Sequence, residues 1–147
     1  TAPGNSVFTL GPIDGTNKSG DDFIAYCWHS VEGFSKFGSY NGNQSANGPF
    51  IYTGFRPAFL LIKGVTIGAS WYLYDTTRNT YNPATKVLLA EDNLAELDYT
   101  FQSIDLLSNG FKIRTDNASF NQGYIYSYAA FAENPFGGEN APPATAR

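Results

Sequence analysis

The sequence predicts an all-β protein folded as an antiparallel β-sandwich of the jelly-roll or concanavalin-like kind. Aromatic residues make up 16% of the 147 residues, with ten Tyr and twelve Phe, and such side chains favour strands over helices. Fifteen Gly and eight Pro supply the turns that many short strands require. The length suits one domain that buries a core of its own.

The strand around which we expect the others to assemble lies at residues 58–63, AFLLIK, within the aromatic stretch 48–63. This run is the most apolar in the chain, is too short to cross a membrane and follows Pro57. An uninterrupted apolar run of this kind is typical of a strand buried on both faces. The sequence therefore places it at the centre of the sandwich, with shorter strands covering it.

Two strands are predicted within the first 31 residues. Residues 7–10 (VFTL) form a short strand, and residues 23–31 (FIAYCWHSV) form a longer one. Alternate residues make the two faces of the longer strand, with Phe23, Ala25, Cys27, His29 and Val31 on one and Ile24, Tyr26, Trp28 and Ser30 on the other. Because both faces are largely apolar, we expect this strand to lie in the middle of a sheet.

The elements after residue 31 follow from alternation and turn signals. We expect strands at 33–40, 69–75 and 86–90, a helical turn at 91–97, a hairpin formed by 102–107 and 111–114, and a last long strand at 124–133. The hairpin rests on the pair Asn109-Gly110, which favours a tight turn between strands.

An internal similarity links the two ends of the chain. Phe111, Ile113, Gly123 and Phe131 each follow a similar residue by 103 positions, namely Phe8, Leu10, Gly20 and Trp28. Two glycine-turned hairpins can align by chance; the alternative is that the chain starts inside the final hairpin of a preceding repeat. We divide the chain into an N-terminal arm and strand at 1–22, interpreted as a remnant of that repeat, a β-sandwich domain at 23–136 and a flexible Pro/Ala-rich tail at 137–147.

Charge and cysteine content exclude several classes of function. The net charge is −4 and the basic residues form no cluster, so we expect no nucleic-acid partner. No segment has the pattern of a signal peptide or the length of an apolar membrane span, so we expect no membrane insertion. The single cysteine excludes a disulfide within the chain.

The sequence offers little catalytic chemistry. His29 is the one histidine, and a pair with Cys27 on the same strand face is the minimum for a thiolate nucleophile, although two packed core residues are the favoured interpretation. The oxygen-rich loop of Asp14, Asn17, Asp21 and Asp22 could bind Ca²⁺ but lacks the spacing of a known calcium loop, so a solvated turn is the favoured interpretation. We therefore expect no enzyme activity, no cofactor and no bound metal.

An ordered set of segments resembles a group of bacteriophage virion proteins, of the tail or fibre type, that contain repeated concanavalin-like or jelly-roll domains. The segments are FIAYCWHSVEGFSKFGSYNGN (23–43), GPFIYTGFRPAFLLIK (48–63), WYLYD followed by TTRN (71–79), IDLLSNGFKIR (104–114) and YAAFAENPF (128–136). The resemblance implies a location on the virion exterior, other virion proteins as partners and a homo-oligomer, with a trimer favoured for a fibre-borne domain.

A binding surface is predicted around residues 70–82, where aromatic and hydrogen-bonding side chains follow one another. Sugar rings stack on aromatic faces while their hydroxyls meet Asn, Asp and Arg side chains. The candidate ligand-binding residues are Trp71, Tyr72, Tyr74, Asp75, Arg78, Asn79 and Tyr81. The alternative is that Trp71 and Tyr74 belong to the core and their neighbours to an ordinary loop, pinned by an ion pair between Asp75 and Arg78.

Two functions therefore remain open. In the first, the chain is a virion adhesin that presents its loops to a glycan or receptor on the host surface, where multivalency makes weak single sites sufficient. In the second, it is a structural capsid-decoration or fibre component that binds other virion proteins and has no ligand site.

Overall fold

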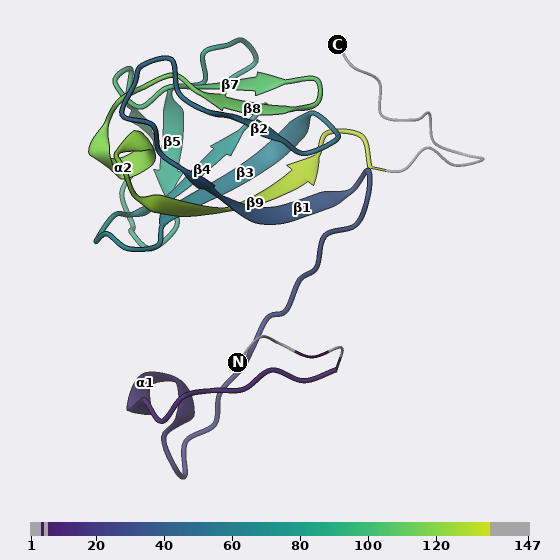
Figure 1. Cartoon of the computed structure of the whole chain (residues 1–147), viewed down its shortest axis with the longest axis vertical. Coiled ribbons are helices and arrows are strands. Elements are labelled where there is room, and N and C mark those ends of the chain that lie inside the picture. Colours follow the sequence, from purple (N-terminus) through teal and green to yellow (C-terminus); the bar gives the residue numbers. More distant parts are fainter. Residues whose placement is uncertain (1–3, 5, 136–147) are drawn as a thin grey trace, which may run out of the picture.

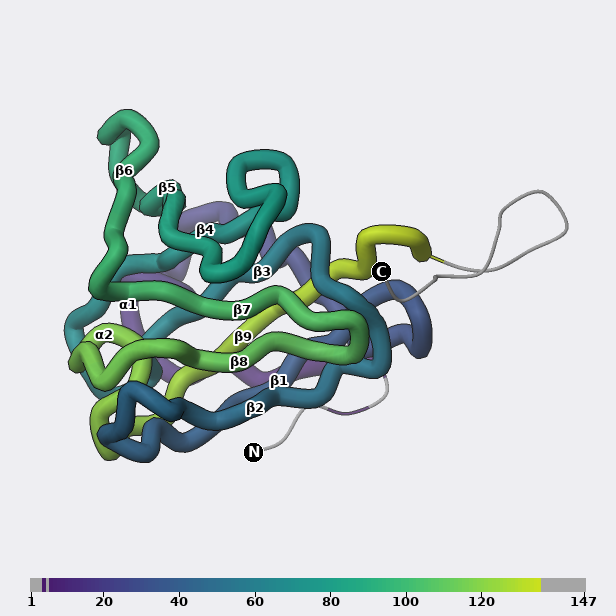
Figure 2. Tube along the Cα trace, turned by 90° about the horizontal axis from the view of Figure 1, so that it is seen from above, coloured from purple at the N-terminus to yellow at the C-terminus, as the bar shows by residue number. Residues whose placement is uncertain are grey.

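The computed structural model describes residue 4 and residues 6–135, and it confirms the predicted all-β antiparallel sandwich (Figure 1). Within these residues the larger sheet has the order β1 (Ser35–Asn41), β9 (Ile125–Ala132), β3 (Pro57–Gly64), β4 (Trp71–Asp75), β5 (Lys86–Leu89) and β6 (Leu97–Asp98). The smaller sheet has the order β2 (Phe50–Tyr52), β8 (Gly110–Ile113) and β7 (Ile104–Leu107). Figure 2 shows β7, β8 and β2 lying across one face of the larger sheet.

Strand β3 contains the predicted apolar run and lies inside the larger sheet. It pairs antiparallel with β9 on one side and with β4 on the other. Leu60 and Ile62 face the smaller sheet and are fully buried, whereas Phe59 and Leu61 on the opposite face are half-buried. The prediction of a central strand with apolar residues on both faces is confirmed.

The core between the sheets is built largely from aromatic rings. Tyr40 stacks on Tyr126 with ring centroids 5.1 Å apart, and Phe111 meets Tyr128 edge to face at 5.2 Å. The tyrosine hydroxyls find partners inside the core: Tyr40 donates to the Phe120 carbonyl over 2.9 Å. A buried tyrosine hydroxyl needs a hydrogen-bond partner, and the core supplies one for Tyr40.

Asn121 fastens the short helix α2 (Ala118–Asn121) to the loop that follows β1. Its side chain is fully buried. The amide nitrogen lies 2.9 Å from the Asn43 Oδ1, 2.6 Å from the Ser45 carbonyl and 2.8 Å from the Thr115 carbonyl, while its Oδ1 accepts from the Asn43 backbone N–H over 2.8 Å. A buried amide with all of its groups paired holds this end of the sandwich in one arrangement.

Residues 6–30 lie outside both sheets and are called the arm below (Figure 1). They carry the short helix α1 (Asp14–Asn17), and both views place them on the side of the larger sheet away from the smaller one. The end of the arm contacts the larger sheet: the Ser30 hydroxyl accepts from the Phe37 N–H over 3.0 Å, and the next residue, Val31, forms an isolated antiparallel bridge with Ser35.

The predicted strands at 7–10 and 23–31 are wrong for this chain. Neither segment contains a strand, and Ile24 and Tyr26 are 81% and 74% exposed. A strand with two apolar faces must be covered on both, and no sheet of the described chain extends to these residues. The alternation at 23–31 is that of a buried strand, but in the described chain no neighbouring strands pack against this segment.

The other differences are small. The hairpin of β7 and β8 and the strands β1, β4, β5 and β9 are confirmed near their predicted positions. The predicted helical turn at 91–97 is wrong, because Leu97 joins β6 and the carboxylate of Glu91 accepts from the Trp71 backbone N–H over 2.9 Å. The predicted tail at 137–147 lies outside the described residues, and the division into domains stays a prediction.

Candidate functional site

The seven residues predicted to bind a ligand separate into three environments. Tyr72 and Tyr74 point into the core, where they are 7% and 0% exposed. The Tyr74 hydroxyl donates to the Gln102 carbonyl over 2.7 Å, and burial raises its pKa above the usual value for tyrosine. These two rings are covered by protein and offer no face for a ligand to stack on.

Asp75, Arg78 and Asn79 fold the loop that follows β4. The Asp75 carboxylate accepts from the backbone N–H of Arg78 and forms the predicted ion pair with its Nε, each over 2.7 Å. Arg78 also contacts Glu96 at 2.9 Å, and hydrogen bonding to Glu96 is the main reason that its pKa is raised. The Asn79 side chain accepts from the Thr85 N–H over 3.0 Å. The polar groups of this loop are largely engaged with one another.

Trp71 and Tyr81 are the two aromatic members that remain exposed, at 43% and 87%. Trp71 lies on the outer face of the larger sheet with the Lys63 ammonium 6.0 Å from its ring centroid, and it lines a shallow hollow of about 210 Å³ that also contains Trp28. Tyr81 belongs to the loop between β4 and β5. The predicted set therefore does not converge on one surface.

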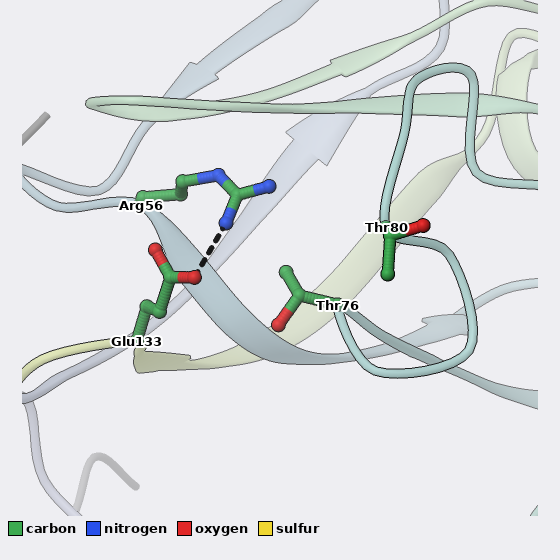
Figure 3. Close-up of a pocket in the computed structure, with 4 residues that line it drawn as sticks. All are labelled: Arg56, Thr76, Thr80 and Glu133. Carbon is green, nitrogen blue, oxygen red and sulfur yellow. Dashed lines mark hydrogen bonds and ion pairs between the residues drawn. The ribbon is translucent and has the colours of Figure 1, made fainter. Parts of the chain in front are cut away.

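A polar cleft that the sequence did not indicate lies beside this loop. Arg56, Thr76, Thr80 and Glu133 line a cleft of about 390 Å³ (Figure 3). Arg56 Nη1 donates to Glu133 Oε1 over 2.7 Å, with side chains 18% and 25% exposed. The second carboxylate oxygen, Glu133 Oε2, is buried and has no hydrogen-bond partner within the described chain. This oxygen is covered by protein, so it is not presented to a ligand in the cleft.

This cleft forms because two distant strand ends meet. Arg56 immediately precedes β3 and Glu133 immediately follows β9, and the Glu133 N–H donates to the Arg56 carbonyl over 2.9 Å. The two residues are separated by 77 positions. Only the register between β3 and β9 could have predicted the contact, and a single sequence does not specify that register.

An apolar hollow lies between the arm and Gly4. Gly4, Ser6, Val7 and Phe8 face the segment 25–29 across a cavity of about 880 Å³. Cys27 is exposed, and the imidazole Nδ1 of His29 lies 3.0 Å from the Ser30 carbonyl oxygen. The interpretation of Cys27 and His29 as packed core residues is therefore wrong in this chain.

Neither a metal-binding cluster nor a membrane-spanning helix is present in the described residues. They contain no group of three or more His, Cys, Asp or Glu side chains placed to hold a metal ion. Across the same part of the chain, no helix has the length and apolar character needed to cross a membrane.

Comparison with known proteins gives one match. A family described as a domain of unknown function, DUF7483, matches residues 1–135, a span that includes both the arm and the sandwich. No curated protein and no solved structure matches the chain.

Proposed function

Because the chain belongs to the DUF7483 family, whose description assigns no function, we propose from its geometry that it is a non-enzymatic structural module that binds other protein chains. The observation that carries the proposal is the arm. Phe23, Ile24, Tyr26 and Trp28 are between 47% and 81% exposed along one continuous segment. Contiguous apolar surface of this kind marks protein interfaces in soluble domains.

A second apolar surface lies on the outer face of the larger sheet. Phe131 of β9 makes edge-to-face contacts with Phe37 of β1 and Phe59 of β3, with ring centroids 5.7 Å apart in both pairs. These rings, together with Leu61, are only half-buried. An antiparallel sheet whose outer face is aromatic is suited to contact with another protein.

The location that fits this role is the exterior of a bacteriophage particle. Support comes from the resemblance of the ordered segments at 23–43, 48–63, 71–79, 104–114 and 128–136 to tail and fibre-type virion proteins. In this proposal the partners are other virion proteins, and the chain acts as a homo-oligomer, with a trimer favoured.

Cross-linking of purified particles with a lysine-reactive reagent, followed by mass spectrometry, tests the proposal. Lys18 lies on the arm with 54% of its side chain exposed, and Lys86 lies on β5 at 46% exposure as the matched control. We expect Lys18 to link to protein outside the residues 1–147 more often than Lys86 does. Equal linking by both lysines, or particles that lack the chain, would contradict the proposal.

Adhesion to a host glycan is the second candidate, and the cleft beside the loop between β4 and β5 favours it. A sugar hydroxyl can hydrogen-bond to the polar side chains that line the cleft, which are Arg56, Thr76, Thr80 and the ion-paired Glu133. Glu133→Gln preserves shape and removes the charge. If the cleft binds sugar, this variant loses oligosaccharide binding on an array that the original chain recognises; an array with no signal above background contradicts adhesion.

A further inference from the structure

We propose that residues 7–30 are the closing strand, helical turn and strand of a second sandwich unit, which a preceding unit of the same fold on the same polypeptide completes. This inference rests on the proposed role of the arm in binding protein, and it names the partner: strands equivalent to β1–β7. The counterpart of the arm within this chain is the segment β8–α2–β9, residues 110–132.

The first support is that the arm and this segment have the same order of local structure. Helices α1 (Asp14–Asn17) and α2 (Ala118–Asn121) are both four residues long. Each follows a segment whose apolar residues match at an offset of 103, since Phe8 corresponds to Phe111. The helices themselves correspond at an offset of 104. Relative to the arm, the segment β8–α2–β9 therefore has one extra residue before its helix and one fewer after it.

The second support is a hydrogen bond that occurs at the same spacing in both segments. The Asn17 side-chain nitrogen donates to the carbonyl of Gly11, six residues earlier, over 3.2 Å. The Asn121 side-chain nitrogen donates to the carbonyl of Thr115, also six residues earlier, over 2.8 Å. Both asparagines end their helices. Because no core surrounds the exposed helix α1, its own local sequence imposes this geometry.

The backbone of the two turns agrees as well. The Asn17 N–H donates to the Ile13 carbonyl over 2.9 Å, and the Asn121 N–H donates to the Asn117 carbonyl over 2.8 Å. Ile13 and Asn117 are the residues that precede the two helices. The arm therefore repeats the backbone hydrogen bond and the terminal asparagine of the α2 region, whereas the helix entries differ, because Asn117 accepts from the Ser119 N–H and Ile13 forms no side-chain cap.

The third support is what the arm lacks. Asn121 also binds Asn43 and Ser45, in the loop after β1, and is fully buried, whereas Asn17 is exposed and has no such loop to bind among the described residues. Phe111 packs against the ring of Tyr128 in the core. In the arm, Phe8 and the corresponding Ala25 face each other across the open cavity of about 880 Å³.

These gaps specify the partner. In the sandwich, Phe111 and Tyr128 meet directly and Tyr40 of β1 packs beside Phe111. The cavity between Phe8 and the segment 25–29 lacks such neighbouring strands, and Asn17 lacks a loop like the one that carries Asn43. A preceding sandwich unit supplies both, because its β1–β7 would surround the arm as β1–β7 of this chain surround β8 and β9. The exposed strand pattern at 23–30, with two apolar faces, would then lie inside a sheet.

A tandem chain tests the inference, with residues 31–107 placed ahead of residues 5–147. The joint follows from the offset, since residue 5 corresponds to residue 108. Cys27 is the only cysteine and corresponds to Ala130, which is fully buried in β9. We expect the thiol to react with a disulfide reagent at least about 100-fold more slowly in the tandem than in the original chain, because reaction would require local opening.

Two matched controls accompany it. Residues 31–133 joined to residues 31–147 give a tandem whose first unit keeps its own β8 and β9, and which shows that two units joined at this position fold. Asn17→Ala should restore Cys27 reactivity in the first tandem while leaving the unfolding of the original chain unchanged. If Cys27 reacts as slowly in the Asn17→Ala tandem as in the first tandem, the proposed contacts of Asn17 are not what protects the thiol, and this result would contradict the inference.

The inference is overturned if Cys27 stays as reactive in the first tandem as in the original chain while the control tandem folds. It is also overturned if Cys27 is already protected in the original chain as a monomer. Failure of the tandem together with preferential cross-linking of Lys18 would leave the proposed function standing with a different partner. Protection in the tandem without any preference for Lys18 would instead remove the proposed function and keep the repeat.

Discussion

The arm and the segment β8–α2–β9 have similar local structure but opposite burial. In both, a four-residue helix ends at an asparagine whose side chain binds a carbonyl six residues earlier. Phe111 in the second segment is fully buried, and Phe8 in the arm is 47% exposed. The comparison teaches that short-range hydrogen bonds fix the turn in either setting, whereas the strands on both sides form only where other strands cover them.

The largest difference should come from the paired phenylalanines. Phe111→Ala opens a cavity in the core and should lower the free energy of unfolding by about 3–5 kcal/mol. Phe8→Ala should change it by less than about 0.5 kcal/mol, because the ring has no core around it in this chain. Urea denaturation followed by circular dichroism measures both. Equal losses would show that the arm is packed in solution.

The paired asparagines should differ next. Asn121→Ala leaves the Asn43 groups and the Ser45 and Thr115 carbonyls without their buried partner, and should cost about 2–3 kcal/mol. Asn17→Ala should cost less than about 0.5 kcal/mol, since water replaces the lost bond to Gly11. A loss above about 1 kcal/mol at Asn17, twice the expected limit, would contradict the comparison.

Alkaline pH should destabilise the sandwich through its core tyrosines. Burial raises the pKa values of Tyr40, Tyr74, Tyr126 and Tyr128 above the usual value for tyrosine. Their contribution to stability is complete below the unfolded-state pKa of about 10 and is lost as the pH rises above it. The urea midpoint should therefore fall above about pH 10. A flat midpoint across this range would contradict the burial of these hydroxyls.

The smallest effect on stability should come from polar substitution of the arm surface. Tyr26→Ser together with Ile24→Ser should leave the urea midpoint unchanged, because both side chains are exposed. The pair should nevertheless reduce binding of an apolar fluorescent dye, which reports exposed hydrophobic surface. The control is Leu60→Ser in β3, which should destabilise the fold. Unchanged dye binding would show that the arm is covered.

Sequence patterns predicted the sandwich well because its strands depend on short-range signals. The apolar run at 58–63, the turn at 109–110 and the alternation at 124–133 led to β3, to the β7–β8 hairpin and to β9. The ion pair of Asp75 and Arg78 was also predictable, since three residues separate its members across a turn.

The same reasoning failed where the outcome depended on distant chain. Residues 23–31 have the alternation of a buried strand, but the pattern cannot tell which strands will cover it. The burial of Tyr72 follows from the face of β4 that the register presents to the core. The contact of Arg56 with Glu133 needed the pairing of β3 with β9. The offset of 103 was the one sequence signal that related residues 23–31 to the last strand of the sandwich, and so indicated which strands would pack against them.

Amide hydrogen exchange, followed by mass spectrometry, tests most directly that the arm copies β8–α2–β9 without its cover. In the original chain, amides of 125–132 should be protected to near the global unfolding free energy and those of 23–30 should exchange freely. In the tandem of residues 31–107 and 5–147, protection of 23–30 should rise to that of 125–132. Protection of 23–30 in the original chain, as an added strand beside β1, would contradict the account.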